Sequence, residues 1–377
     1  MNLSLRCGRH GVLTVFFLHF LLIVSAQPVL ETGGKAMPNE WIDNSTGHKI
    51  AKLTRREGNN MSFYFHNNPF AGNKMIFYGT DFLNTAKNDS IKQETGNITA
   101  GNKQLYSVDI KTLKAEQLTF RSSPVNGEIL APQNRLVYYQ VKDSVFSTHI
   151  DSKETKLLYV FPPDFKAAVT AVNSNETLLA GAWSSDKEKE IFKNNPGKSD
   201  YFNLIYEAKE PRTLFTLNVK TGELKKIFTD SAWLNHIQFS TKDPNLLMFC
   251  HEGPWHKVDR MWTIDISTGK ARIMHKRTMP MEIAGHEFPS VDGKKIWFDL
   301  QMPKGETFYL ASVDVKTGEE MKYAMKRDEW SIHFTISPDQ KLFAGDGGDP
   351  GQVAKAKDGD GFICLLLRVI AYIRRSW

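Results

Sequence analysis

This sequence of 377 residues contains few cysteines and has a small net charge. Its three cysteines, Cys7, Cys250 and Cys364, are too few for a disulfide scaffold or a cysteine-based zinc module. Residues 27–357 carry 43 basic and 40 acidic side chains, an excess too small and too dispersed for a nucleic-acid-binding surface. A small or oligomeric anion is still compatible with this balance. Aromatic residues are plentiful, with 24 Phe, 11 Tyr and 8 Trp, and this composition favours β-strands.

The motifs of several common enzyme classes are also missing. The chain contains no H-E-x-x-H metalloprotease motif, no G-x-S-x-G nucleophile elbow, no P-loop and no G-x-G-x-x-G after a predicted strand. A glycine-rich segment, FAGDGGDPGQ at 343–352, contains Asp346 and Asp349 but lacks the EF-hand spacing of oxygen ligands. We therefore interpret it as a tight loop between repeats and not as a calcium site.

The N-terminus has the features of a targeting segment. Arg6 and Arg9 precede an apolar stretch at 11–24, and the small residues at 24–26 offer a cleavage site. The apolar stretch is shorter than the ~20 residues that a membrane-spanning helix needs. Residues 1–26 are therefore predicted to be a secretory signal peptide. The mature protein is expected to be exported, periplasmic or secreted, and to have no membrane span.

Five segments repeat one pattern of strand, tight turn and strand. They are LYSVDIKTLKAEQLT (105–119), VFSTHIDSKETKLLY (145–159), LFTLNVKTGELKKIF (214–228), MWTIDISTGKARIMH (261–275) and FYLASVDVKTGEEMKY (308–323). Their alignment places Asp109, His149, Asn218, Asp265 and Asp314 in register, at spacings of 40, 69, 47 and 49 residues. A polar turn between alternating apolar runs predicts a β-hairpin in each segment. The longest spacing contains a polar insertion at about 185–212, which we expect to form a loop on one face.

A second β-rich element precedes each hairpin, as in NPFAGNKMIFYG at 68–79 and VDGKKIWFDL at 291–300. Together the two elements predict four short strands every 40–50 residues, which is the period of a β-propeller blade. We count five complete blades between about residues 67 and 325 and a sixth that begins at Ser331. The predicted fold is all-β, of a seven-bladed β-propeller type with the last blade incomplete or missing. Residues 27–66 are expected to form an N-terminal lead segment and 67–357 the propeller domain.

The C-terminal segment differs from the repeats. Residues 358–377, DGDGFICLLLRVIAYIRRSW, lack strand alternation and turn residues, and their apolar part is too short to cross a membrane. We interpret this segment as an aberrant hydrophobic tail produced by a truncation or frameshift. A terminal strand or an amphipathic tail is the alternative interpretation.

Histidines in polar loops are the candidate functional residues. Three motifs carry them: FCHEGPWHKVDRMW with His251, Glu252, His256 and Arg260, AGHEFPS with His286, and WSIHFTISPD with His333. A single histidine at the start of a blade can be structural, hydrogen-bonded to a neighbouring strand. Three motifs beside inner strands are instead expected to converge at one mouth of the central channel, where a ligand would bind. Arg260, at the start of a strand, would then bind the carboxylate of an anion.

These motifs, together with LFAGDGGD and an N-terminal YFHNNPF, resemble the oligogalacturonate lyases, a family of bacterial pectin-degrading enzymes with a seven-bladed propeller fold. The resemblance runs from about residue 45 to 357. It implies an oligogalacturonate substrate and a β-elimination, in which a base removes the C5 proton beside the uronate carboxylate and the glycosidic oxygen at C4 leaves. A divalent metal, typically manganese (Mn²⁺), and an arginine would neutralise that carboxylate.

The resemblance also implies the roles of particular residues. It places the base on His286, the carboxylate-binding arginine on Arg260 and a metal ligand on His333. Residues lining the substrate site would be His251, Glu252 and His256. The family's other metal ligands, a Gln and two His in a Q-x-x-H-x-H pattern, have no counterpart after His333, and one imidazole does not hold manganese alone.

Two other functions are alternatives to an exported lyase. The first is a non-catalytic propeller that binds a carbohydrate or a protein partner. The second is the propeller of a peptidase that has lost its hydrolase domain, and no serine elbow supports it. The histidine and arginine motifs favour the lyase, because a scaffold needs no histidine at three blade mouths.

Overall fold

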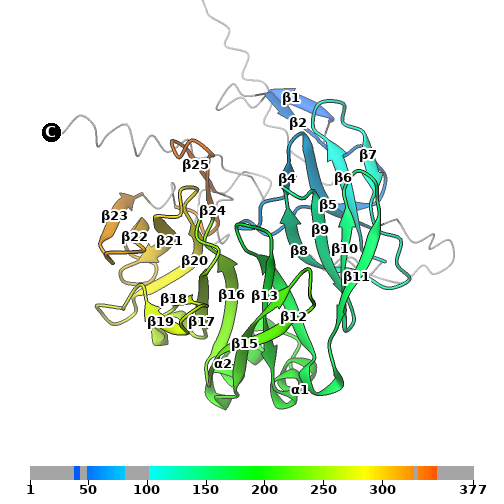
Figure 1. Ribbon diagram of the computed structural model, residues 1–377. Coiled ribbons are helices and arrows are strands. Elements are labelled where there is room, and N and C mark those ends of the chain that lie inside the picture. Colours follow the sequence, from blue (N-terminus) through cyan, green and yellow to red (C-terminus); the bar gives the residue numbers. More distant parts are fainter. Residues whose placement is uncertain (1–37, 43–48, 81–101, 327–329, 346–377) are drawn as a thin grey trace, which may run out of the picture. The chain divides into compact units, whose positions relative to one another are not determined.

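The computed structural model describes residues 38–42, 49–80, 102–326 and 330–345. The chain divides into two compact units, Met1–Ala51 and Lys52–Trp377 (Figure 1). In the first unit, strands β1 (Glu40–Ile42) and β2 (Lys49–Ala51) form an antiparallel hairpin. No helix among the described residues is both long and apolar enough to cross a membrane. The predicted signal peptide at 1–26 and the predicted tail at 358–377 lie outside the described residues.

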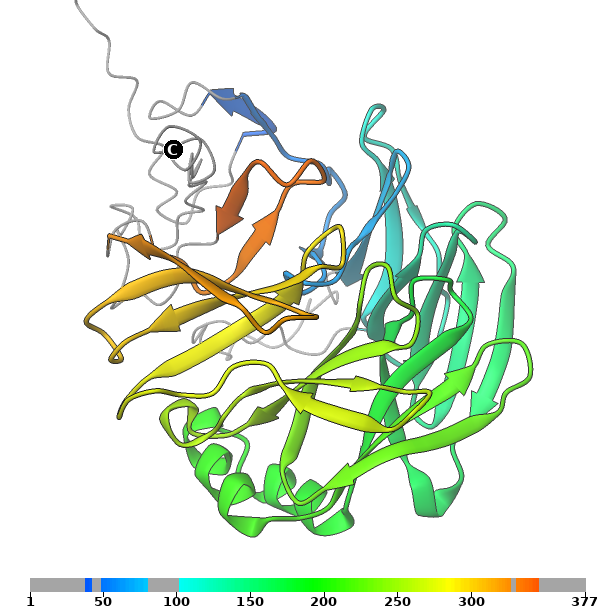
Figure 2. The same cartoon turned by 60° about the vertical axis from the view of Figure 1, so that its left-hand side comes forward.

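The second unit contains five antiparallel sheets, which we call blades 1 to 5 in chain order (Figures 1 and 2). Blade 1 consists of β3 (Asn59–Met61), β4 (Phe70–Ala71), β5 (Lys74–Thr80), β6 (Gln104–Asp109) and β7 (Ala115–Gln117). Blade 2 consists of β8 (Asn126–Ala131), β9 (Leu136–Val141), β10 (Ser144–His149) and β11 (Thr155–Val160). Blade 3 consists of β12 (Ala167–Val172), β13 (Leu178–Ser184), β14 (Arg212–Asn218) and β15 (Leu224–Asp230).

Blades 4 and 5 repeat this meander. Blade 4 consists of β16 (Trp233–Phe239), β17 (Leu246–Glu252), β18 (Met261–Asp265) and β19 (Lys270–Ile273). Blade 5 consists of β20 (Ile283–Pro289), β21 (Lys295–Gln301), β22 (Phe308–Asp314) and β23 (Glu320–Met325). A two-stranded sheet follows, with β24 (Phe334–Ile336) and β25 (Phe343–Gly345). The all-β propeller with five blades is confirmed, whereas the described residues do not confirm a count of seven.

The residues aligned by the repeats hold the hairpin turns together. The side-chain oxygen of Asn218 accepts hydrogen bonds from the backbone N–H groups of Lys220 (2.9 Å) and Thr221 (3.0 Å). Equivalent pairs of backbone donors bond to the side chains of Asp109, His149, Asp265 and Asp314. Asp, Asn and a histidine nitrogen can each accept such bonds, which explains why these residue types share one register.

Most clusters of the hydrophobic core are shared by two neighbouring sheets, and one small cluster around Phe77 lies within blade 1. One shared cluster joins Leu130 and Val137 of blade 2 to Ile76 and Leu105 of blade 1. Similar clusters join blades 2 and 3, blades 3 and 4, and blades 4 and 5. A fifth cluster packs Phe334 and Phe343 of the β24–β25 pair against blade 5. Apolar strands buried on both faces therefore hold neighbouring blades together.

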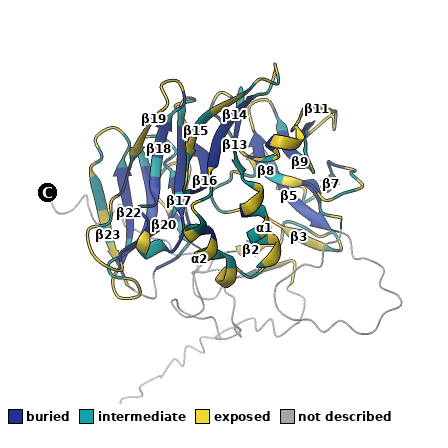
Figure 3. Cartoon of the chain, turned by 90° about the horizontal axis from the view of Figure 1, so that it is seen from below, coloured by how far each residue is buried: buried dark blue, intermediate teal, exposed yellow. Residues whose placement is uncertain are grey.

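The predicted loop at about 185–212 is wrong, because the structure has two helices there. Helix α1 (Asp186–Asn194) and helix α2 (Lys198–Ala208) interrupt blade 3, and both expose one face (Figure 3). The Ser185 hydroxyl accepts a hydrogen bond from the Glu188 N–H at 3.1 Å, which caps α1. Ser at the cap and Glu three residues later are a sequence signal for a helix start. The buried Glu188 carboxylate also binds Arg212 of β14 and so anchors α1 to the blade.

The propeller unit begins earlier than the predicted boundary at residue 67. Strand β3 pairs with β5, so Asn59–Met61 belongs to blade 1. The compact unit itself starts at Lys52. The segment after β3 consequently belongs to the propeller and brings Tyr64, Phe65 and His66 to the site described next.

Candidate functional site

The first strand of blades 2 to 5 carries a β-bulge at the same place. The pairing register shifts at Gly127-Glu128 in β8, at Thr170 in β12, at His236-Ile237 in β16 and at His286-Glu287 in β20. A bulge adds an unpaired residue to a strand and turns its side chain in a new direction. These four bulges set the side chains of the site.

Three of the bulges contain a residue with positive φ, and in two of them this residue is a histidine. His236 has φ of 47° and His286 has φ of 50°, a region that side chains rarely adopt. Such residues persist only where the surrounding structure compensates for the strain, and they cluster at functional sites. The two histidines therefore occupy equivalent, strained positions in neighbouring blades.

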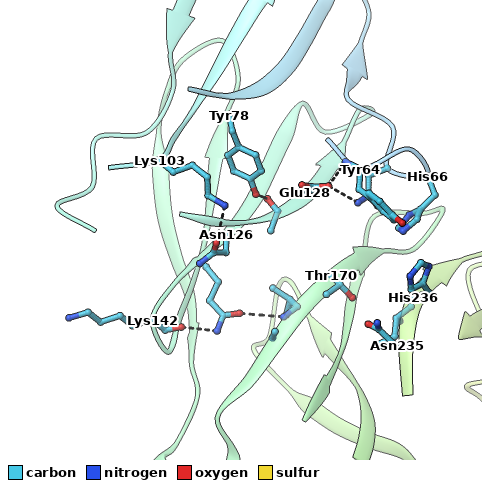
Figure 4. A pocket seen from close by; sticks show the side chains of 16 residues that line it. Tyr64, His66, Tyr78, Lys103, Asn126, Glu128, Lys142, Thr170, Asn235 and His236 are labelled. Atoms are coloured by element: carbon cyan, nitrogen blue, oxygen red, sulfur yellow. Dashed lines mark hydrogen bonds between the residues drawn. The ribbon is translucent and has the colours of Figure 1, made fainter. Parts of the chain in front are cut away.

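An open cavity of about 590 Å³ lies between the first strands of blades 2 to 4 and the segment after β3 (Figure 4). His236, Asn235 and Thr170 line it together with Tyr64 and His66. Other lining residues come from blades 1 and 2, including Tyr78, Lys103, Asn126, Glu128, Gln140 and Lys142. The cavity is thus concave, is lined by several blades and contains polar side chains of both charges, as ligand sites commonly do.

Four histidines from distant parts of the sequence gather beside Tyr64. We call His66, His236, His286 and His333 the histidine cluster. The Tyr64 ring contacts the rings of His66, His236 and His333 at centroid distances of 5.1, 5.9 and 5.2 Å. The Tyr64 hydroxyl is 3.1 Å from Nε2 of His333. His286 meets His333 at a centroid distance of 4.7 Å, so the structure brings these two predicted residues together.

His286 has the geometry of an oriented imidazole. Its Nδ1 lies 2.6 Å from Oδ1 of Asp299, and its side chain is 15% exposed. A carboxylate accepts this hydrogen bond from Nδ1–H, so the neutral form of the imidazole has its lone pair on Nε2. This arrangement suits a general base.

His236 is a site residue that the sequence analysis missed. Its Nδ1 lies 3.7 Å from Oε1 of Glu287, and its Nε2 lies 3.9 Å from Oε2 of Glu252. Burial, followed by the charge of Arg260, lowers the pKa of His236 to about 4 against the opposing pull of the two carboxylates. The imidazole is therefore neutral near pH 7, and a pKa this low makes it a weaker proton acceptor than an ordinary histidine.

Arg260 lies beneath the cavity as part of a buried ion-pair network. Its Nη1 donates to Oε1 of Glu252 at 2.6 Å and its Nε donates to Oε2 of Glu287 at 2.9 Å, and its side chain is only 3% exposed. Burial favours the neutral form of Glu287, but Arg260 and His236 outweigh it and lower the pKa of Glu287 to about 2. The Trp255 indole N–H donates to Glu252 as well. Both oxygens of the predicted substrate-binding Glu252 thus face neighbouring protein groups.

The other two predicted substrate-binding residues lie apart from the histidine cluster. His251 in β17 stacks on Trp262, with ring centroids 4.7 Å apart, and its Nε2 is 3.6 Å from Asp230. His256 lies in a short 3₁₀ helix, Trp255–Lys257, where its backbone oxygen accepts a hydrogen bond from Arg277. Neither is among the described residues that line the cavity.

The described residues do not by themselves fit a metal ion. No three His, Cys, Asp or Glu side chains in the described ranges are placed to hold one. Nδ1 of His286 faces Asp299 and Nε2 of His333 faces the Tyr64 hydroxyl. A metal with about six ligands would need a different arrangement of these groups.

Comparison with known proteins gives a consistent family. The model of the oligogalacturonate lyase family matches residues 36–364, which ends inside the predicted tail. The oligogalacturonate lyase of Dickeya dadantii is 28% identical over 314 residues, covering 81% of this chain and 74% of the relative. The oligogalacturonide lyase of Pectobacterium atrosepticum matches with the same identity and coverage.

Two solved structures share the fold. An oligogalacturonate lyase in complex with manganese superposes with a TM-score of 0.69 and 25% identity, covering 82% of this chain and 77% of that chain. An oligogalacturonate lyase from Vibrio parahaemolyticus has a TM-score of 0.69 and 23% identity, covering 84% and 79%. Because the family match spans most of the sequence and includes every blade described above, the chain belongs to the oligogalacturonate lyase family.

Proposed function

We propose that this protein is an oligogalacturonate lyase that cleaves short pectin-derived oligogalacturonates by β-elimination. The observation that carries the proposal is the histidine cluster beside a polar cavity, in a chain of the oligogalacturonate lyase family. Imidazoles at strained bulges provide a base, and the cavity provides room for a saccharide.

The reaction needs a proton acceptor and charge neutralisation. A base removes H5 of one galacturonate unit, the C4–O bond breaks, and a C4=C5 double bond forms in conjugation with the carboxylate. The departing oxygen takes up a proton. Because the carboxylate is already negative, the carbanion-like transition state gains from nearby cations or hydrogen-bond donors.

We assign the base to the pair of histidines at equivalent bulges. His286, the residue implied by the family resemblance, has its proton fixed on Nδ1 by Asp299. His236 is the second candidate, because it lines the cavity directly and is held neutral by burial. Comparison of the His286→Ala and His236→Asn variants distinguishes the two, because only the loss of the base lowers kcat strongly.

The proposed role of Arg260, binding the substrate carboxylate, needs a rearrangement of the buried ion pairs. Its guanidinium would have to leave Glu252 or Glu287 to meet a ligand. In the described arrangement it neutralises two carboxylates next to His236. The Arg260→Lys variant tests the role, because a lysine keeps the charge but loses the forked geometry. Carboxylate binding by Arg260 predicts a rise in KM.

A divalent metal, manganese, is part of the proposal and rests on the family and on the manganese complex of the solved relative. His333 is the proposed ligand among the described residues. When bound, such a metal would supply positive charge beside the reacting carboxylate.

The decisive experiment is an ultraviolet assay for unsaturated product from digalacturonate. The folded protein is assayed with added Mn²⁺, without it and with a chelator. Product formation establishes the lyase, and loss of product with chelator establishes the metal. No product from folded protein under all conditions contradicts the proposal and supports the alternative, a non-catalytic propeller that binds carbohydrate.

We also propose export through the signal peptide at 1–26. The basic and apolar residues of that segment support this proposal. N-terminal sequencing of the protein from fractionated cells tests it, and a mature N-terminus at Gln27 is expected. An intact N-terminus in the cytoplasmic fraction would contradict it.

A further inference from the structure

Lys103 is a partly buried cation that faces the cavity from blade 1, whereas His236 and His286 lie in blades 4 and 5. It directly precedes β6 of blade 1, and its side chain lines the same cavity as His236 (Figure 4). Its Nζ donates to Oδ1 of Asn126 at 3.1 Å. The ammonium also lies 4.3 Å from the centre of the Tyr78 ring, a cation–π distance. A neutral amide and an aromatic ring thus orient this side chain.

No carboxylate among the described residues pairs with Lys103 within 4.0 Å. Glu128 is the acidic residue among those that line the cavity. Its Oε2 instead accepts hydrogen bonds from the Tyr64 N–H at 2.5 Å and from the Asn67 amide at 3.1 Å. Glu128 therefore fixes the segment that carries Tyr64 and His66, and Lys103 keeps its charge available to a ligand.

This arrangement fits an anion whose charges are spaced along a chain. Burial lowers the pKa of Lys103, and the charge of Glu128 offsets this only in part. The protein therefore replaces only part of the hydration that stabilises the ammonium in water. A ligand carboxylate would supply that compensation through a charge-assisted hydrogen bond. An oligogalacturonate carries one carboxylate on each sugar unit, so a unit bound beside the histidines leaves another carboxylate for a second position.

We propose that Lys103, with Asn126 and Tyr78, forms a subsite that binds the carboxylate of the non-reacting galacturonate unit. The proposal rests on the lyase function proposed above and adds a substrate-specificity residue to it. Lys103 is not a catalytic residue, because it acts on a unit that undergoes no bond change. It selects substrates that are charged at both units.

The test compares Lys103→Met with wild type on two substrates. One is digalacturonate, and the other is digalacturonate methyl-esterified on the non-reacting unit. Wild type is expected to show a KM about tenfold to a hundredfold lower for the fully charged substrate, the range of one charge-assisted hydrogen bond. Lys103→Met should raise KM for digalacturonate by that factor and leave kcat within about twofold of wild type. The variant should have the same KM for the two substrates.

Two controls make the result specific. Lys103→Arg keeps the positive charge and should restore most of the preference for the charged substrate. Lys220→Met changes an exposed lysine in the hairpin turn of blade 3 and should leave KM unchanged. If Lys103→Met does not fold, Lys103→Arg and the salt dependence of KM on wild type still report on the subsite, because a charge contact weakens as salt rises.

The outcomes separate this proposal from the proposed function. A wild-type protein that makes no unsaturated product refutes the lyase. A wild-type protein that cleaves both substrates with equal KM, or a Lys103→Met variant that keeps the preference, refutes the subsite and leaves the lyase standing.

Discussion

The strained conformations of His236 and His286 show how single residues create this site. Both residues occupy bulges with positive φ in the first strand of a blade, and neither conformation follows from a β-strand pattern. The strain needs compensation from the surroundings, and Asp299 supplies it at His286 through a short hydrogen bond. Chemistry at this site therefore depends on irregularities that interrupt an otherwise regular sheet.

Replacing His286 tests the base directly. We expect His286→Ala to lower kcat by about 10²–10⁴, the usual contribution of a general base, while the affinity for digalacturonate changes little. The measurement is steady-state kinetics together with direct binding of digalacturonate. A variant that turns over at the wild-type rate would remove His286 from the mechanism and leave His236 as the base.

The buried histidines also make stability depend on pH. Burial is the largest cause that lowers the pKa of His66 to about 3 and that of His236 to about 4, from an ordinary value of 6.5. Between pH 6.5 and 4 the unfolded chain binds more protons than the folded one, so the free energy of unfolding falls as pH falls. The contribution of His236 over this window is on the order of 3 kcal/mol.

Urea unfolding at several pH values measures this dependence. The matched variant is His236→Asn, because asparagine tolerates positive φ and does not titrate. Its stability should change less with pH than that of wild type. Equal slopes for the two proteins would contradict a buried neutral His236.

At the scale of elements, the hairpins explain why the repeats were visible in the sequence. One turn residue per blade accepts two backbone N–H groups, so Asp, Asn or His recurs at the same position. The bulges carry no comparable local signal, because their position depends on pairing with the next strand. His236 was missed for this reason.

Two other segments have features that were not predicted from the sequence. The motif YFHNNPF carried part of the family resemblance, yet the roles of Tyr64 and His66 appear only when the segment after β3 reaches the cavity. The helical insertion was predicted as a loop because its composition is polar. Its cap, Ser185 with Glu188, was the available signal for a helix.

Asn218 offers a test of the turn mechanism. We expect Asn218→Ala to reduce the free energy of unfolding by about 1 kcal/mol, since two backbone N–H groups lose a side-chain acceptor. Asn218→Asp should be tolerated within a few tenths of a kcal/mol, because aspartate accepts the same bonds in blades 1, 4 and 5. Chemical denaturation measures both variants. Equal losses in the two would show that the side-chain acceptor is not what stabilises the turn.

At the scale of the whole molecule, stability comes from the interfaces between blades. Four core clusters each draw on two neighbouring blades, and only a small cluster around Phe77 lies within one described blade. The five-bladed repeat could be predicted from the 40–50-residue period, because every blade reuses one strand pattern. The convergence of His66, His236, His286 and His333 could be predicted only in part, because it depends on how blades are placed around the cavity.

Phe249 tests whether neighbouring blades unfold together. Its side chain is fully buried in the cluster between blades 3 and 4. Phe249→Ala should lower stability by about 3–5 kcal/mol and leave one cooperative transition, since the lost contacts belong to both blades. Tryptophan fluorescence and far-ultraviolet circular dichroism should then give coincident unfolding curves. Separate transitions in the variant would mean that blades unfold independently.

The four aligned bulges also make this propeller a convenient starting point for directed evolution. Glu128, Thr170, His236 and His286 differ in chemistry, and each lies in the bulge of one of four successive blades. A combinatorial library restricted to these four codons would sample new binding chemistries and leave the packed interfaces between blades untouched. Histidine, asparagine, aspartate and glycine should be enriched among folded clones at 236 and 286, where the backbone is left-handed. Position 128 should retain a side chain that accepts the hydrogen bonds from Tyr64 and Asn67, whereas 170 should accept a wider range of residues.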